Sequence, residues 1–191
     1  MISIGITGII GSGKSMLSQV FRSMDIPVYD ADSKAQSLMN SSLYIRTRLV
    51  IEFGSDTYRN DKINKEYLRK VVFGDEKNRQ IVNSIVHPVV KNDFIDWREK
   101  TGAKIVAIES AIIFDAKLED ILDKIIFVEA PQDILVKRIC LRDMVSEDVA
   151  LSKIKMQTAN SGRDKCDAIF INDRNHSLIE QTENFINNLK Y

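Results

Sequence analysis

The chain has 191 residues, a length that suits one α/β domain with room for an inserted subdomain. Its 27 basic and 27 acidic residues cancel, so the overall charge favours neither nucleic acid nor an anionic membrane as a partner, and we expect neither. No stretch reaches the roughly 18 apolar residues of a membrane span. The two cysteines, Cys140 and Cys166, have neither metal-ligand spacing nor the density of a disulfide framework, which fits a reducing compartment. We therefore expect a cytoplasmic protein.

A phosphate-binding loop lies near the N-terminus. Residues 8–15 read Gly-Ile-Ile-Gly-Ser-Gly-Lys-Ser and fit the pattern G-x-x-x-x-G-K-[ST]. A short buried strand is expected over residues 2–7 before this pattern, and a helix with regularly spaced apolar residues after it. In that order, loop amides and the helix dipole attract phosphate, Lys14 reaches the outer phosphate oxygens and Ser15 can hold Mg²⁺. The motif therefore predicts a nucleoside triphosphate site.

Two carboxylates, Asp30 and Asp32, follow a second short β-rich run over residues 26–29. Ligands bind at the carboxyl ends of strands in open α/β sheets, so a carboxylate there could orient an acceptor hydroxyl, accept its proton or hold metal-bound water. Alternatively, one of the two caps the helix that starts near Ser33, because Asp is a favoured N-cap. Both interpretations can hold, one for each aspartate.

Residues 35–100 have a different character, with many polar residues and apolar positions that recur every three or four. This pattern predicts a helical subdomain inserted in a nucleotide-binding core of residues 1–34 and 101–191, well placed to carry the acceptor site. Asn64 and Asp75 are candidate helix caps, and Pro88 would take the first position of the last helix. The helices are expected over residues 35–39, 43–53, 65–73, 76–86 and 88–99, with a turn region over 54–61.

Three further strands are expected after the insertion, over residues 104–110, 124–128 and 168–171. Helical stretches between them favour a parallel, buried sheet, because right-handed crossovers join parallel strands. Glu109 ends the first of these strands, where an acid could help place Mg²⁺ or simply accept a hydrogen bond. The polar loop over residues 172–175 is either a plain turn or a contact to a nucleotide base. A final helix is expected over residues 177–189.

Two helices that follow the fourth strand are expected to form a lid over about residues 137–165. Arg138 and Arg142 lie four residues apart in the first of them, so they share one helix face and can point together at a triphosphate. The alternative is a solvated face with ion pairs within the helix, Asp133 to Lys137 and Arg138 to Asp143. The two helices are expected over residues 131–142 and 146–157.

The order and spacing of these motifs resemble the dephospho-CoA kinase family over nearly the whole chain. The resemblance implies the α/β fold of a P-loop kinase, with a five-stranded parallel sheet flanked by helices, a helical substrate insertion and a helical lid. It implies an enzyme that uses ATP and Mg²⁺ to phosphorylate the ribose 3′-hydroxyl of dephospho-CoA, the last step of coenzyme A biosynthesis. The residues that carry the resemblance are Gly5 to Ser15, Asp30-Ala31-Asp32, Phe73, His87-Pro88, Glu109 to Asp115, the Arg138 and Arg142 pair, Gln157, and Ala168 to Asn172.

The resemblance also implies roles for individual residues. Lys14 would neutralise charge on the transferring phosphoryl group, Ser15 would hold Mg²⁺, and Arg138 and Arg142 would close from the lid as further catalytic residues. Asp32 would be the acceptor-side carboxylate, both catalytic and substrate-binding. His87 would lie near the CoA moiety, although a histidine before a proline can also cap the preceding helix and pack. The ATP phosphates would be held by Gly11, Ser12, Gly13, Lys14, Ser15 and Met16.

Several positions depart from the family's pattern. Ile9 stands where the family usually has Gly, and a β-branched residue cannot readily take a positive φ. If the position needs a positive φ, the loop geometry must differ slightly; if it does not, Ile9 adds packing. Met16 replaces a Thr, and Lys65 stands where the family tends to have Arg, which exchanges a fork of donors for a point charge.

Two rival functions stay open. Another small-molecule kinase of the same architecture, acting on a nucleoside monophosphate or on shikimate, would share the loop, the sheet and the lid. A nucleotide-dependent binding module without transferase activity is the rival from another class, although no guanine-reading Asn-Lys-x-Asp motif follows a strand. We expect a monomer or a weak homo-oligomer whose partner is the small-molecule substrate.

Overall fold

The computed structural model describes residues 1–158 and 162–189. The chain forms two compact units, one of residues 1–29 and 102–191 and the other of residues 30–101. The sequence predicts a core that continues to residue 34, whereas the units change at residues 29 and 30, so Asp30 and Asp32 both belong to the second unit. Among the described residues, no helix combines the length and the apolar character needed to cross a membrane.

The first unit is built on a five-stranded parallel sheet, as the sequence predicts. The strand β1 lies at its centre, where Ile6 is opposite Glu109 of the next strand on one side and Thr7 is opposite Phe127 on the other. Most residues of the central strands are buried, as expected for a parallel sheet covered on both faces. The strands are β1 (Ile2–Thr7), β2 (Val28–Asp30), β5 (Ile105–Glu109), β6 (Lys124–Glu129) and β7 (Ala168–Ile171), in the order β2-β5-β1-β6-β7.

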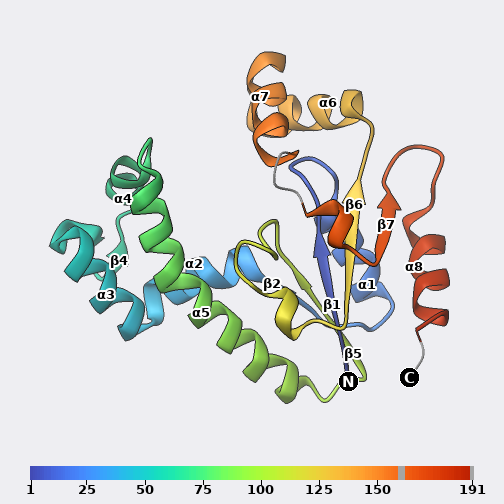
Figure 1. Cartoon of the computed structure of the whole chain (residues 1–191), viewed down its shortest axis with the longest axis horizontal. Helices are drawn as coiled ribbons and strands as arrows, with labels where there is room; N and C mark the ends of the chain where they lie inside the picture. Colours follow the sequence, from blue (N-terminus) through green and yellow to red (C-terminus); the bar gives the residue numbers. More distant parts are fainter. Residues whose placement is uncertain (159–161, 190–191) are drawn as a thin grey trace. The chain divides into compact units, whose positions relative to one another are not determined.

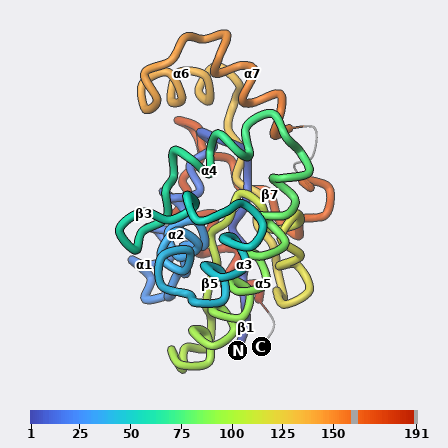
Figure 2. The backbone as a smooth tube through the Cα atoms, turned by 90° about the vertical axis from the view of Figure 1, so that its left-hand side faces the viewer, coloured from blue at the N-terminus to red at the C-terminus, as the bar shows by residue number. Residues whose placement is uncertain are grey.

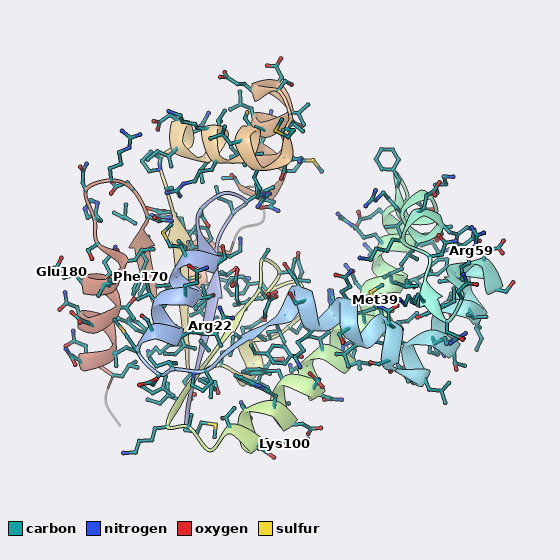
Figure 3. The ribbon with its side chains drawn as sticks, turned by 180° about the vertical axis from the view of Figure 1, so that it is seen from behind. Arg22, Met39, Arg59, Lys100, Phe170 and Glu180 are labelled. Carbon is teal, nitrogen blue, oxygen red and sulfur yellow. The ribbon has the colours of Figure 1, made fainter. Side chains whose placement is uncertain are left out.

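Helices α1 (Lys14–Ser23) and α8 (Leu178–Asn187) cover one face of the sheet (Figure 1). Leu17 and Phe21 of α1 are fully buried against strand residues in a continuous apolar core. Phe170 of β7 lies beside α8 (Figure 3), where its ring meets that of Phe185 edge-on with 5.8 Å between the ring centroids. This core fixes the end of β1 and the start of α1, and so it positions the loop between them.

The segment between β5 and β6 covers the opposite face. It includes a short 3₁₀ helix (Glu119–Ile121), and its residues Ile113 and Leu118 are almost completely buried. A Cβ atom on Gly5 would come within 2.7 Å of Ile113 and 2.8 Å of Leu122. Because Gly5 has no side chain, the segment between β5 and β6 can pack directly against β1 at this position.

A helical hairpin of α6 (Gln132–Asp143) and α7 (Glu147–Thr158) lies beyond the carboxyl end of the sheet (Figures 1 and 2). Its two helices match the predicted lid helices. Between them, Leu135, Ile139, Ala150 and Ile154 form a second apolar cluster. A short 3₁₀ helix (Arg163–Lys165) follows; the predicted lid also includes residues 159–161, which lie outside the described residues.

The second unit contains four helices and a small hairpin. Each of the first three helices begins at a side-chain cap, Asp30 for α2, Ser42 for α3 and Asn64 for α4. The caps at Asp30 and Asn64 agree with the sequence. The elements are α2 (Ala31–Ser41), α3 (Leu43–Phe53), a 3₁₀ helix (Ser55–Thr57), β3 (Tyr58–Arg59), β4 (Lys62–Ile63), α4 (Lys65–Val72) and α5 (Glu76–Thr101).

The predicted turn region over residues 54–61 is only partly correct, because an antiparallel hairpin occupies its second half. β3 pairs with β4, and the two residues between them, Asn60 and Asp61, have φ values of 50° and 59°. Positive φ at both central residues is typical of the tight turns that suit the twist of a hairpin, and Asn and Asp tolerate it. The strands are too short to produce a clear alternating pattern in the sequence.

The two helices predicted over residues 76–86 and 88–99 are wrong as separate elements. The structure has one helix, α5, which runs through Pro88. Proline removes one backbone hydrogen bond, but Ile85, Val86, Val90 and Phe94 are buried on both sides of it, so packing favours a continuous helix over a break. Pro88 itself is exposed. His87 therefore does not cap the end of a helix.

Candidate active site

The glycines of the loop over residues 8–13 are required by its shape. Gly8, Gly11 and Gly13 have φ values of 146°, 80° and 98°, which residues other than glycine rarely adopt. A Cβ atom on Gly8 would overlap the carbonyl oxygen of Val128, and one on Gly13 would overlap the side-chain amide of Asn172. The loop is thus a cradle of backbone held tightly against its neighbours.

Ile9 does not have a positive φ, so its side chain does not distort the loop. It packs with Ile10 against the apolar cluster between α6 and α7. The backbone N–H of Ile10 also donates to Oε1 of Gln157 in the last turn of α7, at 2.6 Å. Of the two alternatives left open by the sequence, the structure supports packing, and this packing joins the loop to the helical hairpin.

Truncation of Ile9 should therefore weaken the packing between the loop and the helical hairpin of α6 and α7. Because the side chain is half-buried, we expect Ile9→Ala to lower the free energy of unfolding by about 1–2 kcal/mol, measured by denaturant or thermal melts. Val149→Ala, a truncation at an exposed position of α7, is the matched control and should change the stability little. Equal stability of Ile9→Ala and the wild type would contradict this role.

Lys14 begins α1 and folds back over the loop. Its Nζ donates to the carbonyl oxygens of Gly8 at 2.9 Å and Ile9 at 3.3 Å. Helix α1 has no side-chain cap, and Gly13 precedes it in a left-handed conformation. Ser15, in the first turn, is exposed. The amides, the helix dipole and the Lys14 ammonium thus concentrate positive potential at one point, which suits an anionic ligand.

Arg138 and Arg142 bind different partners. Arg138 of α6 donates through Nη1 to the carbonyl oxygens of Gly11 at 3.2 Å and Ser12 at 3.3 Å, so its charge lies beside the loop. Arg142, one turn later and 60% exposed, forms a two-point ion pair with Asp143. Hydrogen bonds from Arg142 and Lys153 hold the pKa of the Asp143 carboxyl well below its usual range. The arginine that pairs with Asp143 is therefore Arg142, not Arg138.

Glu109 accepts a hydrogen bond at the end of β5, as one of the two predicted alternatives has it. Its Oε2 receives the hydroxyl of Ser18, a fully buried residue of α1, at 2.6 Å. The carboxylate thereby joins the strand next to β1 to the helix that follows the loop. It reinforces the position of α1.

The acceptor-side candidates belong to the second unit. Asp30 accepts hydrogen bonds from the backbone N–H of Ser33 at 2.9 Å and from its hydroxyl at 2.7 Å, so the capping role falls to Asp30. Asp32 is exposed in the first turn of α2. His87 is half-buried in the middle of α5. Among the described residues, no group of three or more His, Cys, Asp or Glu side chains has the arrangement of a metal site.

Two residues that contact the loop are not predictable from local patterns. Asn172, after β7, is 4% exposed and bonds Ser12, although its sequence context suggests a surface turn. Gln157 contributes to the family resemblance, but only the structure shows its bond to Ile10. Both contacts join segments more than a hundred residues apart. A single sequence contains no pattern that identifies the distant hydrogen-bond partner of an Asn or Gln side chain.

The chain is similar in sequence to one family of known proteins. The family model for dephospho-CoA kinase matches residues 2–178. A dephospho-CoA kinase of Porphyromonas gingivalis is 36% identical over 192 residues, covering 100% of this chain and 95% of the relative, and one of Bacteroides fragilis is 35% identical, covering 94% and 89%.

Solved structures share the fold. A crystal structure from Thermus thermophilus has a TM-score of 0.80 at 25% identity and covers 97% of this chain and 95% of that one. A shikimate kinase of Bacteroides thetaiotaomicron, at 15% identity and a TM-score of 0.60, covers 97% and 98%. The fold alone therefore does not choose among kinases, whereas the sequence does. Since the family model spans most of the chain and relatives above 30% identity span nearly all of it, the chain belongs to the dephospho-CoA kinase family.

Proposed function

We propose that the protein transfers the γ-phosphate of ATP to the ribose 3′-hydroxyl of dephospho-CoA and so forms coenzyme A. The observation that carries this proposal is the glycine-shaped loop with Lys14 folded over it, in a chain of this family. The rivals are a shikimate or nucleoside monophosphate kinase and a binding module. Shikimate kinases share the fold, but the family match favours dephospho-CoA as the acceptor.

The donor side of the proposed site fits ATP with Mg²⁺. A Cβ atom on Gly8 or Gly13 would overlap a neighbouring atom, and one on Gly11 would come within 3.1 Å of Ile139, so backbone alone forms the cradle at these positions. We propose that the amides of residues 11–16 hold the phosphates and that the exposed hydroxyl of Ser15 is a ligand of Mg²⁺. When bound, the metal neutralises charge on the phosphate oxygens.

On the acceptor side, Asp32 would orient the 3′-hydroxyl and accept its proton. The hydroxyl oxygen then attacks the γ-phosphorus, the bond from that phosphorus to the bridging oxygen breaks, and ADP leaves. Lys14 and Arg138 contribute positive charge beside the loop. Arg142 would have to exchange Asp143 for a phosphate oxygen to act in this step. Positioning and charge neutralisation supply most of the rate.

The remaining assignments are part of the same proposal. Residues 35–100 would form the CoA-binding subdomain, and His87 would lie near the CoA moiety. A cytoplasmic location and a monomeric or weakly associating state stay predictions from the sequence.

An acceptor panel tests the choice of substrate. With Mg-ATP at a fixed concentration, ADP release is measured with dephospho-CoA, shikimate or AMP as the acceptor. We expect dephospho-CoA to be preferred by orders of magnitude in kcat/KM. A higher kcat/KM for shikimate or AMP would overturn the proposed acceptor, and slow ATP hydrolysis that no acceptor stimulates would favour the binding module.

A further inference from the structure

We propose that Asn172 is a positioning residue that orients the amide of Gly13 toward the donor phosphates. The inference deepens the proposed function and rests on its nucleotide site, although not on the identity of the acceptor. Asn172 follows β7 and is 4% exposed. Its backbone N–H donates to the carbonyl oxygen of Glu129 at 2.8 Å, which continues the pairing of β6 with β7 and fixes the residue to the sheet.

The side chain of Asn172 bonds the loop directly. Its Nδ2 donates to the carbonyl oxygen of Ser12 at 2.8 Å, in a buried contact between residues 160 positions apart. The other end of the side chain is also held, because Oδ1 and the backbone oxygen of Asn172 accept from Nη2 of Arg138 at 3.4 and 3.3 Å. Arg138 donates in turn to the carbonyls of Gly11 and Ser12. The amide therefore sits in a network with a defined orientation.

Holding these carbonyls fixes the directions of the next N–H groups. A trans peptide is planar, so its C=O and N–H point in opposite directions. With the oxygen of Gly11 drawn to Arg138, the N–H of Ser12 points into the loop, where it donates to the oxygen of Ile9 at 3.2 Å. With the oxygen of Ser12 drawn to Asn172, the N–H of Gly13 points away from Asn172 and the sheet. That is the direction in which a phosphate oxygen can accept it.

Gly13, the last glycine of the motif, lies directly against the side chain of Asn172. A Cβ atom on Gly13 would overlap Nδ2 of Asn172, and the φ of 98° already favours glycine. The hydroxyl of Ser12 is buried and, within the described part of the chain, has no hydrogen-bond partner. Within that part of the chain, Ser12 is therefore held by hydrogen bonds of its backbone and not of its side chain. The contacts of its carbonyl oxygen with Asn172 and Arg138 set the orientation of the Ser12–Gly13 peptide.

The substitution Asn172→Asp tests the inference with little change in volume. It keeps an acceptor for Arg138 but places a carboxylate oxygen where Nδ2 donates to Ser12. The carbonyl oxygen of Ser12 thus loses its shorter hydrogen bond and keeps only the 3.3 Å contact to Arg138, so the Ser12–Gly13 peptide is held less firmly. Loss of one buried hydrogen bond together with the added repulsion should raise the Kd for Mg-ADP and the KM for ATP about tenfold or more. The KM for dephospho-CoA should change less than about twofold, because nothing on the acceptor side is altered.

Controls separate positioning from a general loss of structure. Asn187→Asp makes the same change at an exposed position of α8 and should leave both constants as they are. Asn172→Ala removes the donor without adding charge and should show the same selective loss, which covers the case in which Asn172→Asp does not fold. In the complex with Mg-ADP, faster hydrogen exchange of the Gly13 amide in either variant would report the weaker contact between this amide and the phosphate.

Two results would overturn the inference. One is an unchanged Kd for Mg-ADP in folded Asn172→Asp or Asn172→Ala, and the other is a parallel rise in both KM values. The binding of Mg-ADP is measured without an acceptor. An inactive wild type that binds Mg-ADP would therefore count against the proposed function and would leave the Asn172 comparison decisive.

Discussion

Replacement of Lys14 by alanine is expected to lower kcat about 10²–10³-fold, as the loss of one fixed group that stabilises developing charge does in other enzymes. The ammonium lies within hydrogen-bonding distance of the loop carbonyls of Gly8 and Ile9, so it already sits over the cradle. Its charge should matter most in the transition state, and kcat should therefore fall more than the KM for ATP rises. The measurement is steady-state kinetics with Mg-ATP and dephospho-CoA.

The fold should survive this change, because Lys14 lies at the start of α1 and contributes no apolar surface to the core. Circular dichroism melts check this point. Lys137→Ala, at an exposed position of α6, removes the same charge away from the loop and should keep nearly the full rate. A wild-type kcat for folded Lys14→Ala would refute the catalytic role of the lysine.

Replacement of Asp32 by asparagine should have an effect of similar size, about 10²–10⁴-fold in kcat if the carboxylate is the general base. Asn is close to Asp in shape but cannot accept the proton of the 3′-hydroxyl. Binding of Mg-ATP without an acceptor should stay near the wild-type value, because the proposed phosphate ligands all lie in the loop and α1. Pre-steady-state measurement of the chemical step gives the most direct comparison.

The chain supplies a matched control two residues away. Asp30 caps α2 through Ser33, and Asn is as good a cap as Asp, so Asp30→Asn should preserve both the helix and most of the rate. Asp30→Asn and Asp32→Asn remove the same charge from neighbouring positions. If Asp30→Asn lost the activity and Asp32→Asn kept it, the two roles would have to be exchanged.

The parts of the molecule that the sequence predicts best are those set by neighbouring residues. The loop, the strand before it and the helix after it follow from glycine positions and apolar spacing, and the caps at Asp30 and Asn64 follow from local side-chain chemistry. The parallel sheet follows from strands separated by helical stretches. Each of these predictions rests on local patterns, although the strands of the sheet themselves pair across about a hundred residues, as Ile2 does with Ile105.

The parts that escape prediction depend on distant contacts. Pro88 suggests a helix boundary, but buried residues on both sides of it keep α5 continuous. Arg138 and Arg142 have the spacing of a matched pair, yet one meets the loop and the other meets Asp143. Asn172 lies in a polar stretch for which the sequence predicts a turn or a base contact. Only the tertiary fold brings its side chain within hydrogen-bonding distance of the Ser12 carbonyl oxygen. The partners of these side chains are chosen by tertiary packing.

Product identification shows directly whether this chain phosphorylates dephospho-CoA. Purified protein is incubated with Mg-ATP and dephospho-CoA, and the products are quantified by mass spectrometry and ³¹P NMR. We expect coenzyme A carrying a new 3′-phosphate monoester, formed in equal amounts with ADP, and formed about 10²–10³-fold more slowly by Lys14→Ala. ADP without phosphorylated acceptor, or phosphate at another position of dephospho-CoA, would contradict the proposed function.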